Sequence, residues 1–185
     1  MELELPHLDK EPVIPDTCYI DVSARINGDV TMGESCSAWF NVCIRGDVNW
    51  IRIGGRTNIQ DGCIFHVTYK AHPLLIGEDV SFGHGIIAHG CEIGNRVLVG
   101  MGSTIMDAAK IEDDVLIGAG SLVTERSHIP SGVLAFGRPA RVVRELNPRE
   151  REMVAARAAH YTGYAAAYRR QGRFTGWADN PYRRP

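Results

Sequence analysis

Residues 93–135 read IGNRVLVGMGSTIMDAAKIEDDVLIGAGSLVTERSHIPSGVLA, and an aliphatic residue returns at every sixth position of this run. The recurring residues are Ile93, Val99, Ile105, Ile111, Ile117, Val123, Ile129 and Ala135. A period of six fits neither the turn of an α-helix nor the alternation of a plain β-strand, and it is typical of a hexapeptide β-helix. Each hexad would form one flat side of a triangular prism, with its aliphatic residue inward and a polar or glycine-rich corner after it.

The same period extends toward the N-terminus with two interruptions. It is carried by Ile14, Ile20, Ile26, Met32, Ala38 and Ile44, then by Ile59 and Phe65, and then by Ile76, Phe82 and Ala88. It falters at residues 50–53 and again at residues 66–76, where Thr68 to Pro73 reads as a loop that leaves the stack. Three hexads make a coil of about eighteen residues. We therefore expect an all-β domain, a parallel β-helix of about seven coils over residues 14–140, preceded by an N-terminal lead at residues 1–13.

One α-helix is predicted over residues 147–172. Asn147 fits the N-cap, Pro148 the first helical position, and Glu150 the third position of a capping box. Gly172 would end the helix. An apolar stripe for packing against the β-helix or a neighbouring subunit is formed by Val154, Ala158, Tyr161, Ala165 and Tyr168. Residues 173–185 form a tail with no predicted structure.

Composition and charge limit the possible classes of protein. The chain is 44% hydrophobic and 23% charged, which is ordinary for a globular domain. It has no run of 18 apolar residues and an acidic start broken by Pro6, so we expect a cytoplasmic protein with no membrane association. Its five cysteines have no C-x-x-C spacing and are expected to be reduced thiols.

The charge is unevenly distributed along the chain. Residues 138–185 carry eleven arginines and four acids, which leaves −9 for the first 137 residues of a chain whose net charge is −2. We expect this basic segment to lie on the acidic body of the protein. Nucleic-acid binding is not expected, because the body would repel phosphate.

Three of the seven histidines, His66, His84 and His89, lie within 24 residues of one another. Imidazole is the commonest neutral ligand for zinc, and a catalytic zinc takes three protein ligands and leaves one position open. If the loop adds five residues to a single side of the prism, His66 and His89 stack one coil apart and His84 falls on the preceding side. If residues 66–76 instead span two shortened sides, His66 stacks over His84 and His89 lies apart. Both registers remain open, and in both the third ligand must come from a second copy, as in a three-fold ring of prisms.

Around these histidines the chain resembles the gamma-class carbonic anhydrase family, especially its compact bacterial members. The similarity spans residues 14 to about 165. The motifs that carry it are Arg45-Gly46-Asp47, Asn58-x-Gln60-Asp61-Gly62 followed by His66, Gly83-His84, and His89-Gly90. The resemblance implies a left-handed β-helix in a homotrimer. It also implies reversible hydration of CO2 to bicarbonate by a zinc-bound hydroxide at the subunit interface, with Fe2+ or Co2+ as alternatives to Zn2+.

The resemblance also implies roles for individual residues. His66 and His89 of one subunit and His84 of the next would bind the metal. Arg45 would contact bicarbonate and pair across the interface with Asp47 or Asp61. Gln60 would hydrogen-bond the metal-bound hydroxide, and Asn58 would line the site. Tyr161 would reach the site from the terminal helix, although its place in the apolar stripe equally fits a core residue.

Two departures from the family prototype point to weak or conditional activity. Val48 stands where the prototype has a glutamate, and a short loop containing His72 replaces a longer acidic loop that carries the proton-shuttle glutamate. His72 is therefore the candidate proton carrier of this chain.

Two other functions fit the sequence. Gly137-Arg138-Pro139-Ala140-Arg141 resembles the end of the β-helix in hexapeptide acetyltransferases, which suggests an acyltransferase or acyl-CoA thioesterase with a histidine as general base. The other alternative is a non-catalytic binding or assembly protein whose metal stabilises the trimer.

Overall fold

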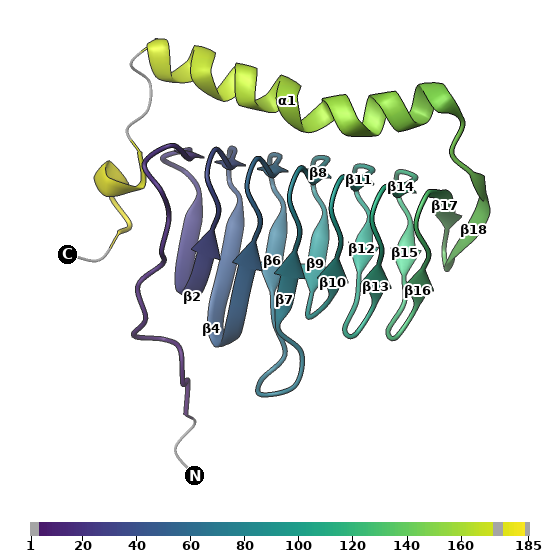
Figure 1. Cartoon of the computed structure of the whole chain (residues 1–185). Helices are drawn as coiled ribbons and strands as arrows, with labels where there is room; N and C mark the ends of the chain where they lie inside the picture. Colours follow the sequence, from purple (N-terminus) through teal and green to yellow (C-terminus); the bar gives the residue numbers. More distant parts are fainter. Residues whose placement is uncertain (1–3, 172–175, 184–185) are drawn as a thin grey trace.

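The computed structural model describes residues 4–171 and 176–183 and consists of a parallel β-helix with one long helix beside it (Figure 1). The predicted parallel β-helix is thereby confirmed. Strands in equivalent positions of successive coils pair in parallel, one coil of about eighteen residues apart, and together they form three flat faces.

The first face carries one short strand from each of seven successive coils. They are β1 (Tyr19–Ile20), β3 (Ser37–Ala38), β5 (Asn58–Ile59), β8 (Ser81–Phe82), β11 (Leu98–Val99), β14 (Leu116–Ile117) and β17 (Val133–Gly137). β18 (Ala140–Glu145) turns back and pairs antiparallel with β17, which ends the stack. The stack makes about six full turns, close to the expected seven, because the last coil has β17 on the first face but no parallel strand on the other two.

Two long strands bend across the second and third faces. They are β2 (Arg25–Met32) and β4 (Cys43–Ile53). The second face continues with β6 (Ile64–His66), β9 (Ile87–His89), β12 (Thr104–Ile105) and β15 (Leu122–Val123). The third face continues with β7 (Leu74–Ile76), β10 (Glu92–Ile93), β13 (Lys110–Ile111) and β16 (His128–Ile129).

The hexad residues form the core, as their period predicts. From Ile20 to Ala135 each of them is at most 4% exposed, whereas Ile14 is only partly buried because no complete coil lies beneath it. Within this core the ring of Phe65, from the second face, contacts the ring of Phe82, from the first face, and the two centroids are 4.7 Å apart. The five cysteines are all free thiols, as expected.

Both interruptions of the period are insertions at the corner between the second and third faces. In β4 the pairing with β2 shifts from Gly28 opposite Gly46 to Val30 opposite Ile51, which inserts three residues into β4. Between β6 and β7 the loop adds five residues to a single side, because Phe65 pairs with Ala88. A corner accepts extra residues because its backbone is not hydrogen-bonded to the neighbouring coils. The inward-facing residues of successive coils therefore stay in register.

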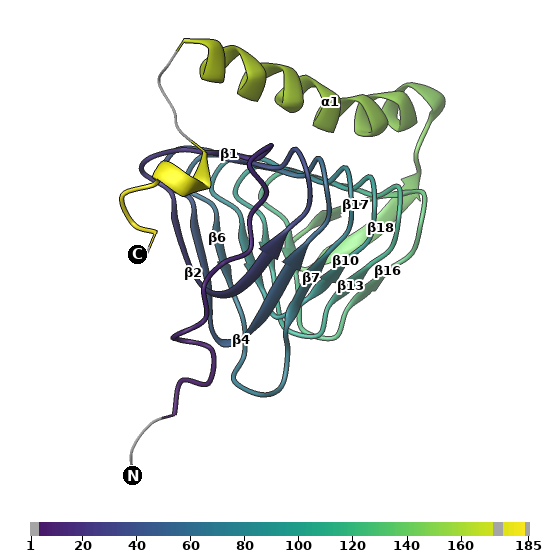
Figure 2. The same ribbon diagram turned by 60° about the vertical axis from the view of Figure 1, so that its left-hand side comes forward.

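The predicted capping box is present at the start of α1 (Pro148–Arg170). The Glu150 amide donates to Asn147 Oδ1 at 2.9 Å, and the Asn147 amide donates to Glu150 Oε2 at 3.0 Å. The helix was expected over residues 147–172; it ends at Arg170, and the predicted stop at Gly172 lies outside the described residues. α1 runs back along the β-helix and buries Val154, Ala158 and Ala165 (Figures 1 and 2).

Part of the tail, for which the sequence predicts no structure, forms a 3-10 helix, η1 (Trp177–Asp179). It lies at the same end of the β-helix as β1 and the N-terminal lead (Figures 1 and 2). Trp177 is 3% exposed and belongs to the hydrophobic core. Within residues 4–171 and 176–183, no helix has the length and apolar character to span a membrane.

Candidate metal site

His66 and His89 are stacked on the outside of the second face, at the ends of β6 and β9. They pair directly across the ladder, and His66 Nδ1 lies 3.1 Å from His89 Nε2. This stacking follows from the register, because neighbouring coils are about 4.8 Å apart and residues in register project together. The register with the loop in a single side is therefore confirmed, and the alternative stacking of His66 over His84 is wrong.

His84 is separate from this pair within one chain. It follows β8, at the corner between the first and second faces, and its Nδ1 lies 2.7 Å from Asp61 Oδ2. Its side chain is about half exposed. Among the described residues of one chain, no three His, Cys, Asp or Glu side chains are grouped closely enough to hold a metal ion. One chain thus brings together two of the three predicted ligands.

A carboxylate lies behind each of the three histidines. Asp47 Oδ1 is 3.2 Å from His66 Nε2, and Asp107 Oδ1 is 2.5 Å from His89 Nδ1. Together with the Asp61–His84 pair, each imidazole has one ring nitrogen beside a carboxylate, and the other ring nitrogens of His66 and His89 face each other. Metal-binding histidines have this arrangement, because a carboxylate on one nitrogen fixes the tautomer and directs the other nitrogen to the metal.

Asp107 was not predicted from the sequence. It lies 18 residues, or one coil, after His89. The eighteen-residue coil length therefore could have indicated that Asp107 lies beside His89. Its second oxygen accepts a hydrogen bond from Thr68 Oγ1 at 2.6 Å, which ties the loop to the site. Gly90 leaves room for this carboxylate, since a Cβ there would lie 2.4 Å from Asp107 Oδ1 and 2.9 Å from the Cβ of His72.

At His66 the environment favours the neutral imidazole, and the neighbouring Asp47 and Asp107 are held in their ionised form. Burial lowers the pKa of His66, and the charges of Arg45 and His89 act in the same direction, against the effect of Asp47. For Asp47, burial opposes ionisation, but hydrogen bonds from Arg45 and His66 outweigh it and lower the pKa. For Asp107, burial likewise raises the pKa. The hydrogen bonds that its carboxylate accepts from Thr68 and His89 outweigh burial, so the pKa is lowered. Neutral imidazole is the form that binds a metal.

Arg45 pairs with Asp47 of its own chain, with Nη1 to Oδ2 at 2.6 Å. About half of the Arg45 side chain is exposed. The expected pairing across an interface, with Asp47 or Asp61, stays a prediction. Within one chain Asp61 is engaged with His84.

Gln60, Asn58 and Tyr161 lie near His84 rather than near the stacked pair. Gln60 Nε2 donates to Asn58 Oδ1 at 3.2 Å, and Asn58 Nδ2 donates to Ser81 Oγ at 2.6 Å, so both amides are held in place. Gln60, His84 and Tyr161 line a pocket of about 380 Å³ beside α1. Tyr161 also packs on Trp39, with ring centroids 5.7 Å apart, and burial raises its pKa. The predicted site residues therefore form two groups in one chain.

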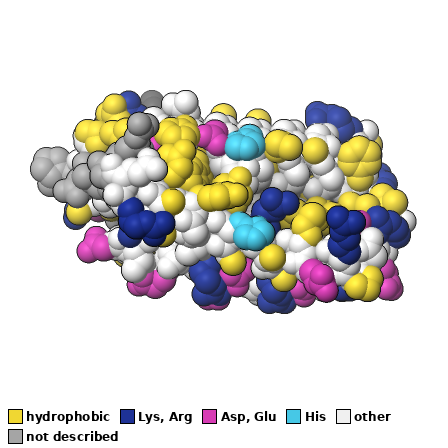
Figure 3. Space-filling view, turned by 90° about the horizontal axis from the view of Figure 1, so that it is seen from above, with side chains coloured by type: hydrophobic (Ala, Val, Ile, Leu, Met, Phe, Trp, Pro, Cys, Tyr) yellow, Lys and Arg dark blue, Asp and Glu magenta, His cyan; other side chains and the backbone are white. Residues whose placement is uncertain are grey.

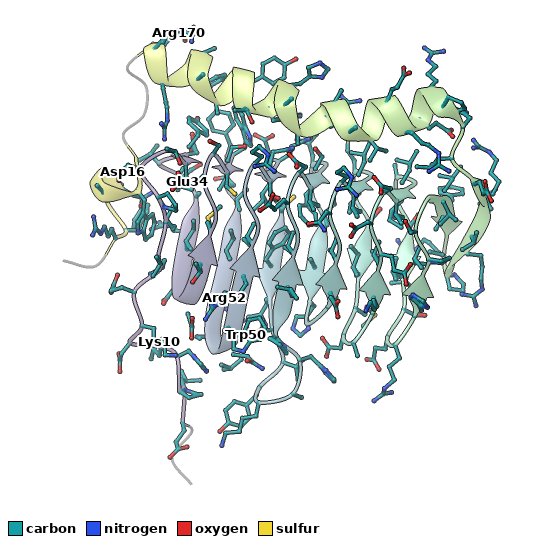
Figure 4. The ribbon with its side chains drawn as sticks, viewed as in Figure 1. Lys10, Asp16, Glu34, Trp50, Arg52 and Arg170 are labelled. Atoms are coloured by element: carbon teal, nitrogen blue, oxygen red, sulfur yellow. The ribbon has the colours of Figure 1, made fainter. Side chains whose placement is uncertain are left out.

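His72 lies close to Gly90, against which Asp107 also packs. It bridges to Thr68 across the loop and helps to line a pocket of about 340 Å³ with Trp50. Trp50 lies near the base of the loop (Figure 4). The role of His72 as proton carrier stays a prediction.

The chain is similar to several known proteins. Residues 90–125 match the family model described as bacterial transferase hexapeptide (six repeats). Protein YrdA of Escherichia coli K12 is 46% identical over 176 residues, 92% of this chain and 96% of the relative. The probable carbonic anhydrase of Methanocaldococcus jannaschii is 49% identical over 149 residues, 80% of this chain and 93% of the relative.

Two further relatives extend the comparison. Gamma carbonic anhydrase 1, mitochondrial, of Arabidopsis thaliana is 36% identical over 165 residues, 86% of this chain and 60% of the relative. A crystal structure of a hexapeptide transferase family protein from Anaplasma phagocytophilum has a TM-score of 0.82 and 38% identity, and the match covers 85% of this chain and 92% of that one.

Proposed function

Because this chain belongs to the gamma-class carbonic anhydrase family, we propose that it catalyses the reversible hydration of CO2 to bicarbonate at a metal site shared by two copies of the chain. The observation that carries the proposal is the stacked pair of His66 and His89, each with a carboxylate on its other ring nitrogen. A surface histidine pair without a function has no need of this arrangement.

The donor set fits a divalent transition metal. Zinc binds histidine nitrogen at about 2.0–2.1 Å in tetrahedral sites, which places two such nitrogens roughly 3.3 Å apart. His66 Nδ1 and His89 Nε2 are 3.1 Å apart. Imidazole also suits iron and cobalt, so we propose Zn2+ with Fe2+ or Co2+ as alternatives. A bound metal of this kind supplies a Lewis acid that lowers the pKa of water to about 7.

The other residues position and stabilise the reactants. Asp47 and Asp107 hold the two imidazoles in one tautomer and orientation. The half-exposed Arg45 guanidinium lies near this pair and can attract bicarbonate, because guanidinium groups bind carboxylate-like anions in two-point contacts. The Gln60 amide, fixed by Asn58, is a polar group for the reacting oxygen atoms.

We propose that a homotrimer completes the site. Ile64 and Ile87 lie two residues before the stacked histidines on the outside of the second face, and they are 47% and 41% exposed. Seen from the helix side, hydrophobic side chains also gather around histidines near the middle of the molecule (Figure 3). Exposed apolar patches of this kind commonly mark protein interfaces. Association there would bring His84, Gln60 and Tyr161 of a second copy toward His66 and His89.

Metal analysis and a stopped-flow assay of CO2 hydration test the function. The wild-type protein loaded with zinc, cobalt or ferrous iron is expected to bind about one metal per chain and to hydrate CO2 faster than buffer. His89→Ala should lose both properties, whereas His128→Ala, which removes an exposed histidine on the third face, should keep both. If the metal-loaded wild type is no faster than buffer, the catalytic proposal is wrong.

A subunit-mixing experiment tests the shared site. His84→Ala and His89→Ala are each expected to lack metal, because every interface loses one ligand. In a mixed three-fold ring, one interface joins His66 and His89 of the first variant to His84 of the second, so refolding the two together should restore metal at about one site per mixed trimer. If all three ligands came from one chain, mixing would restore none.

An acyl-CoA reaction is the second candidate function, favoured by the pocket beside His84. This pocket is also lined by the apolar residues Leu98, Met101 and Leu116, and Asp61 orients the His84 ring in the manner of a general base. Acetyl-CoA turnover after treatment with a chelator, measured on wild type and His84→Ala, tests it. Metal-dependent trimer formation without any turnover would instead indicate a non-catalytic assembly protein.

A further inference from the structure

Arg157 is a cation on α1 that has no anionic partner within its own chain. Its side chain is partly buried, and among the residues that the structure describes it forms neither an ion pair nor a hydrogen bond. An arginine on a helix commonly pairs with an acid three or four residues away. No acid stands at these distances from Arg157, where the chain has Met153, Val154, His160 and Tyr161. The guanidinium is therefore available to an anion from outside the chain.

Arg157 lines the pocket of about 380 Å³ that lies between α1 and the first face. In this region α1 passes over β8, β11 and β14 (Figure 1). The side chains of Leu98, Met101 and Leu116 make much of the opposite wall apolar. None of the described residues that line the pocket is acidic. A pocket that contains a guanidinium and no carboxylate attracts anions.

Tyr161 connects Arg157 to the proposed metal ligand His84. It lies one helical turn after Arg157, so both side chains are on the same side of α1. Burial raises the pKa of Tyr161, and the charges of Arg157 and Asp61 act on the same hydroxyl in opposite directions. Asp61 in turn lies 2.7 Å from His84. Arg157, Tyr161 and His84 therefore surround one space, which the buried Gln60 also lines.

We propose that Arg157 binds bicarbonate at the shared metal site, with its guanidinium donating two hydrogen bonds to the anion and the Tyr161 hydroxyl donating a third. Bicarbonate presents two oxygens in a plane, as a carboxylate does, and a guanidinium matches this geometry. Arg45 lies beside the stacked histidines and Arg157 beside His84, so a complete site would take one guanidinium from each copy of the chain. This inference rests on the function proposed above.

Bicarbonate binding to the cobalt-loaded protein tests this inference without relying on turnover. Titration at constant pH and ionic strength is expected to change the visible absorption of the bound Co2+ in a saturable manner. Arg157→Gln is expected to raise the Kd for bicarbonate by about tenfold or more, because a charged two-point contact is lost. Arg157→Lys keeps the charge but not the planar pair of donors, so it should lose less affinity than Arg157→Gln.

Two further variants serve as a control and as a second test. Arg149→Gln removes an exposed arginine at the start of α1, outside the pocket, and should bind bicarbonate as wild type does. Tyr161→Phe removes only the hydroxyl and is expected to raise the Kd by about threefold. This variant keeps the test decisive if Arg157→Gln does not fold.

Cobalt content and light scattering accompany each titration. Arg157→Gln is expected to retain both the metal and the trimer. An unchanged Kd in Arg157→Gln would overturn the inference. Loss of the trimer in this variant would also overturn it, because Arg157 would then serve the contact between copies. If the wild type itself binds no cobalt, the metal site proposed above is wrong, and the assignment of Arg157 falls with it.

Discussion

Asp107 joins three parts of the chain at one carboxylate. It accepts hydrogen bonds from His89 at 2.5 Å and from Thr68 at 2.6 Å, and it lies against Gly90. The loop between β6 and β7 is thereby tied to a proposed metal ligand. The orientation of the His89 ring depends on this link, since the ring itself is only partly enclosed.

Asp107→Asn is expected to weaken metal binding by about 10–100-fold, because the neutral amide no longer fixes the His89 tautomer. Competition against a chelator of known affinity, with metal content read by mass spectrometry, measures the change. Glu125→Gln removes an exposed acid at a similar corner and is the matched control. Equal affinity in all three proteins would show that Asp107 does not support the metal.

Asp29 is expected to stabilise the protein in a pH-dependent manner. Burial opposes its ionisation, but Lys10, Arg52 and His7 outweigh burial and lower the pKa of Asp29 to about 2. Lys10 and Arg52 extend to this position from the N-terminal lead and from β4 (Figure 4). A depressed carboxyl pKa contributes stability above the unfolded pKa of about 3.9 that is lost as the pH falls toward 2.

Asp29→Asn should therefore lower the free energy of unfolding by about 1 kcal/mol at pH 6, given the exposure of Lys10 and Arg52, and by almost nothing at pH 2. Urea unfolding at the two pH values measures both quantities. A loss of the same size at pH 2 would mean that packing, and not charge, stabilises this position.

At the scale of single residues, the sequence indicated the histidines and the neighbouring Asp47 and Asp61, but not how these residues are grouped. His66, His84 and His89 were identified by residue type and by motif. Their grouping depended on the register across the loop at residues 66–76, and the period alone allows two registers there. Asp107 was missed for the same reason, because its place behind His89 follows only once the coil lengths are known.

At the scale of the element, the hexad period predicted the strands because the core columns repeat without exception from Ile93 to Ala135. It indicated an interruption at residues 50–53 but not which residues of β4 are inserted, because corner residues take no part in the ladder. The capping box made the start of α1 predictable, whereas its packing partners Tyr19 and Trp39 come from distant coils.

The corner glycines set how closely successive coils approach. A Cβ on Gly54 would lie 2.5 Å from the backbone carbon and oxygen of Gly77 in the next coil. Gly54→Ala is therefore expected to destabilise the protein by about 2 kcal/mol or more. Gly163→Ala, on the exposed side of α1 with nothing within 4 Å, should stabilise it by about 0.5–1 kcal/mol.

Thermal and urea unfolding of the two glycine variants measure this contrast. Both substitutions add one methyl group, so a difference in sign isolates the close approach of the coils from any general effect of alanine. If Gly54→Ala unfolds at the same urea concentration as wild type, the corners are looser than these contacts indicate.

At the scale of the whole molecule, the second face is the expected contact between copies. Ile64→Glu would place a charge among the exposed apolar residues beside His66, so we expect monomers that bind no metal. Leu75→Glu is the matched control, because Leu75 is 42% exposed at an equivalent outward position on the third face. Light scattering and metal analysis of both variants measure the outcome. A trimer of Ile64→Glu would place the interface elsewhere.

Trp177 and β18 have a consequence for how large an assembly this protein can form. A stack of identical coils has bare backbone at both extremities, where another molecule could add end to end and lengthen the rod without limit. β18 pairs with the last coil at one end of the β-helix, and the indole of Trp177 covers the hydrophobic core at the other end. Removal of the C-terminal segment that contains Trp177 should therefore favour end-to-end association at the first coil. The end capped by β18 should still not associate.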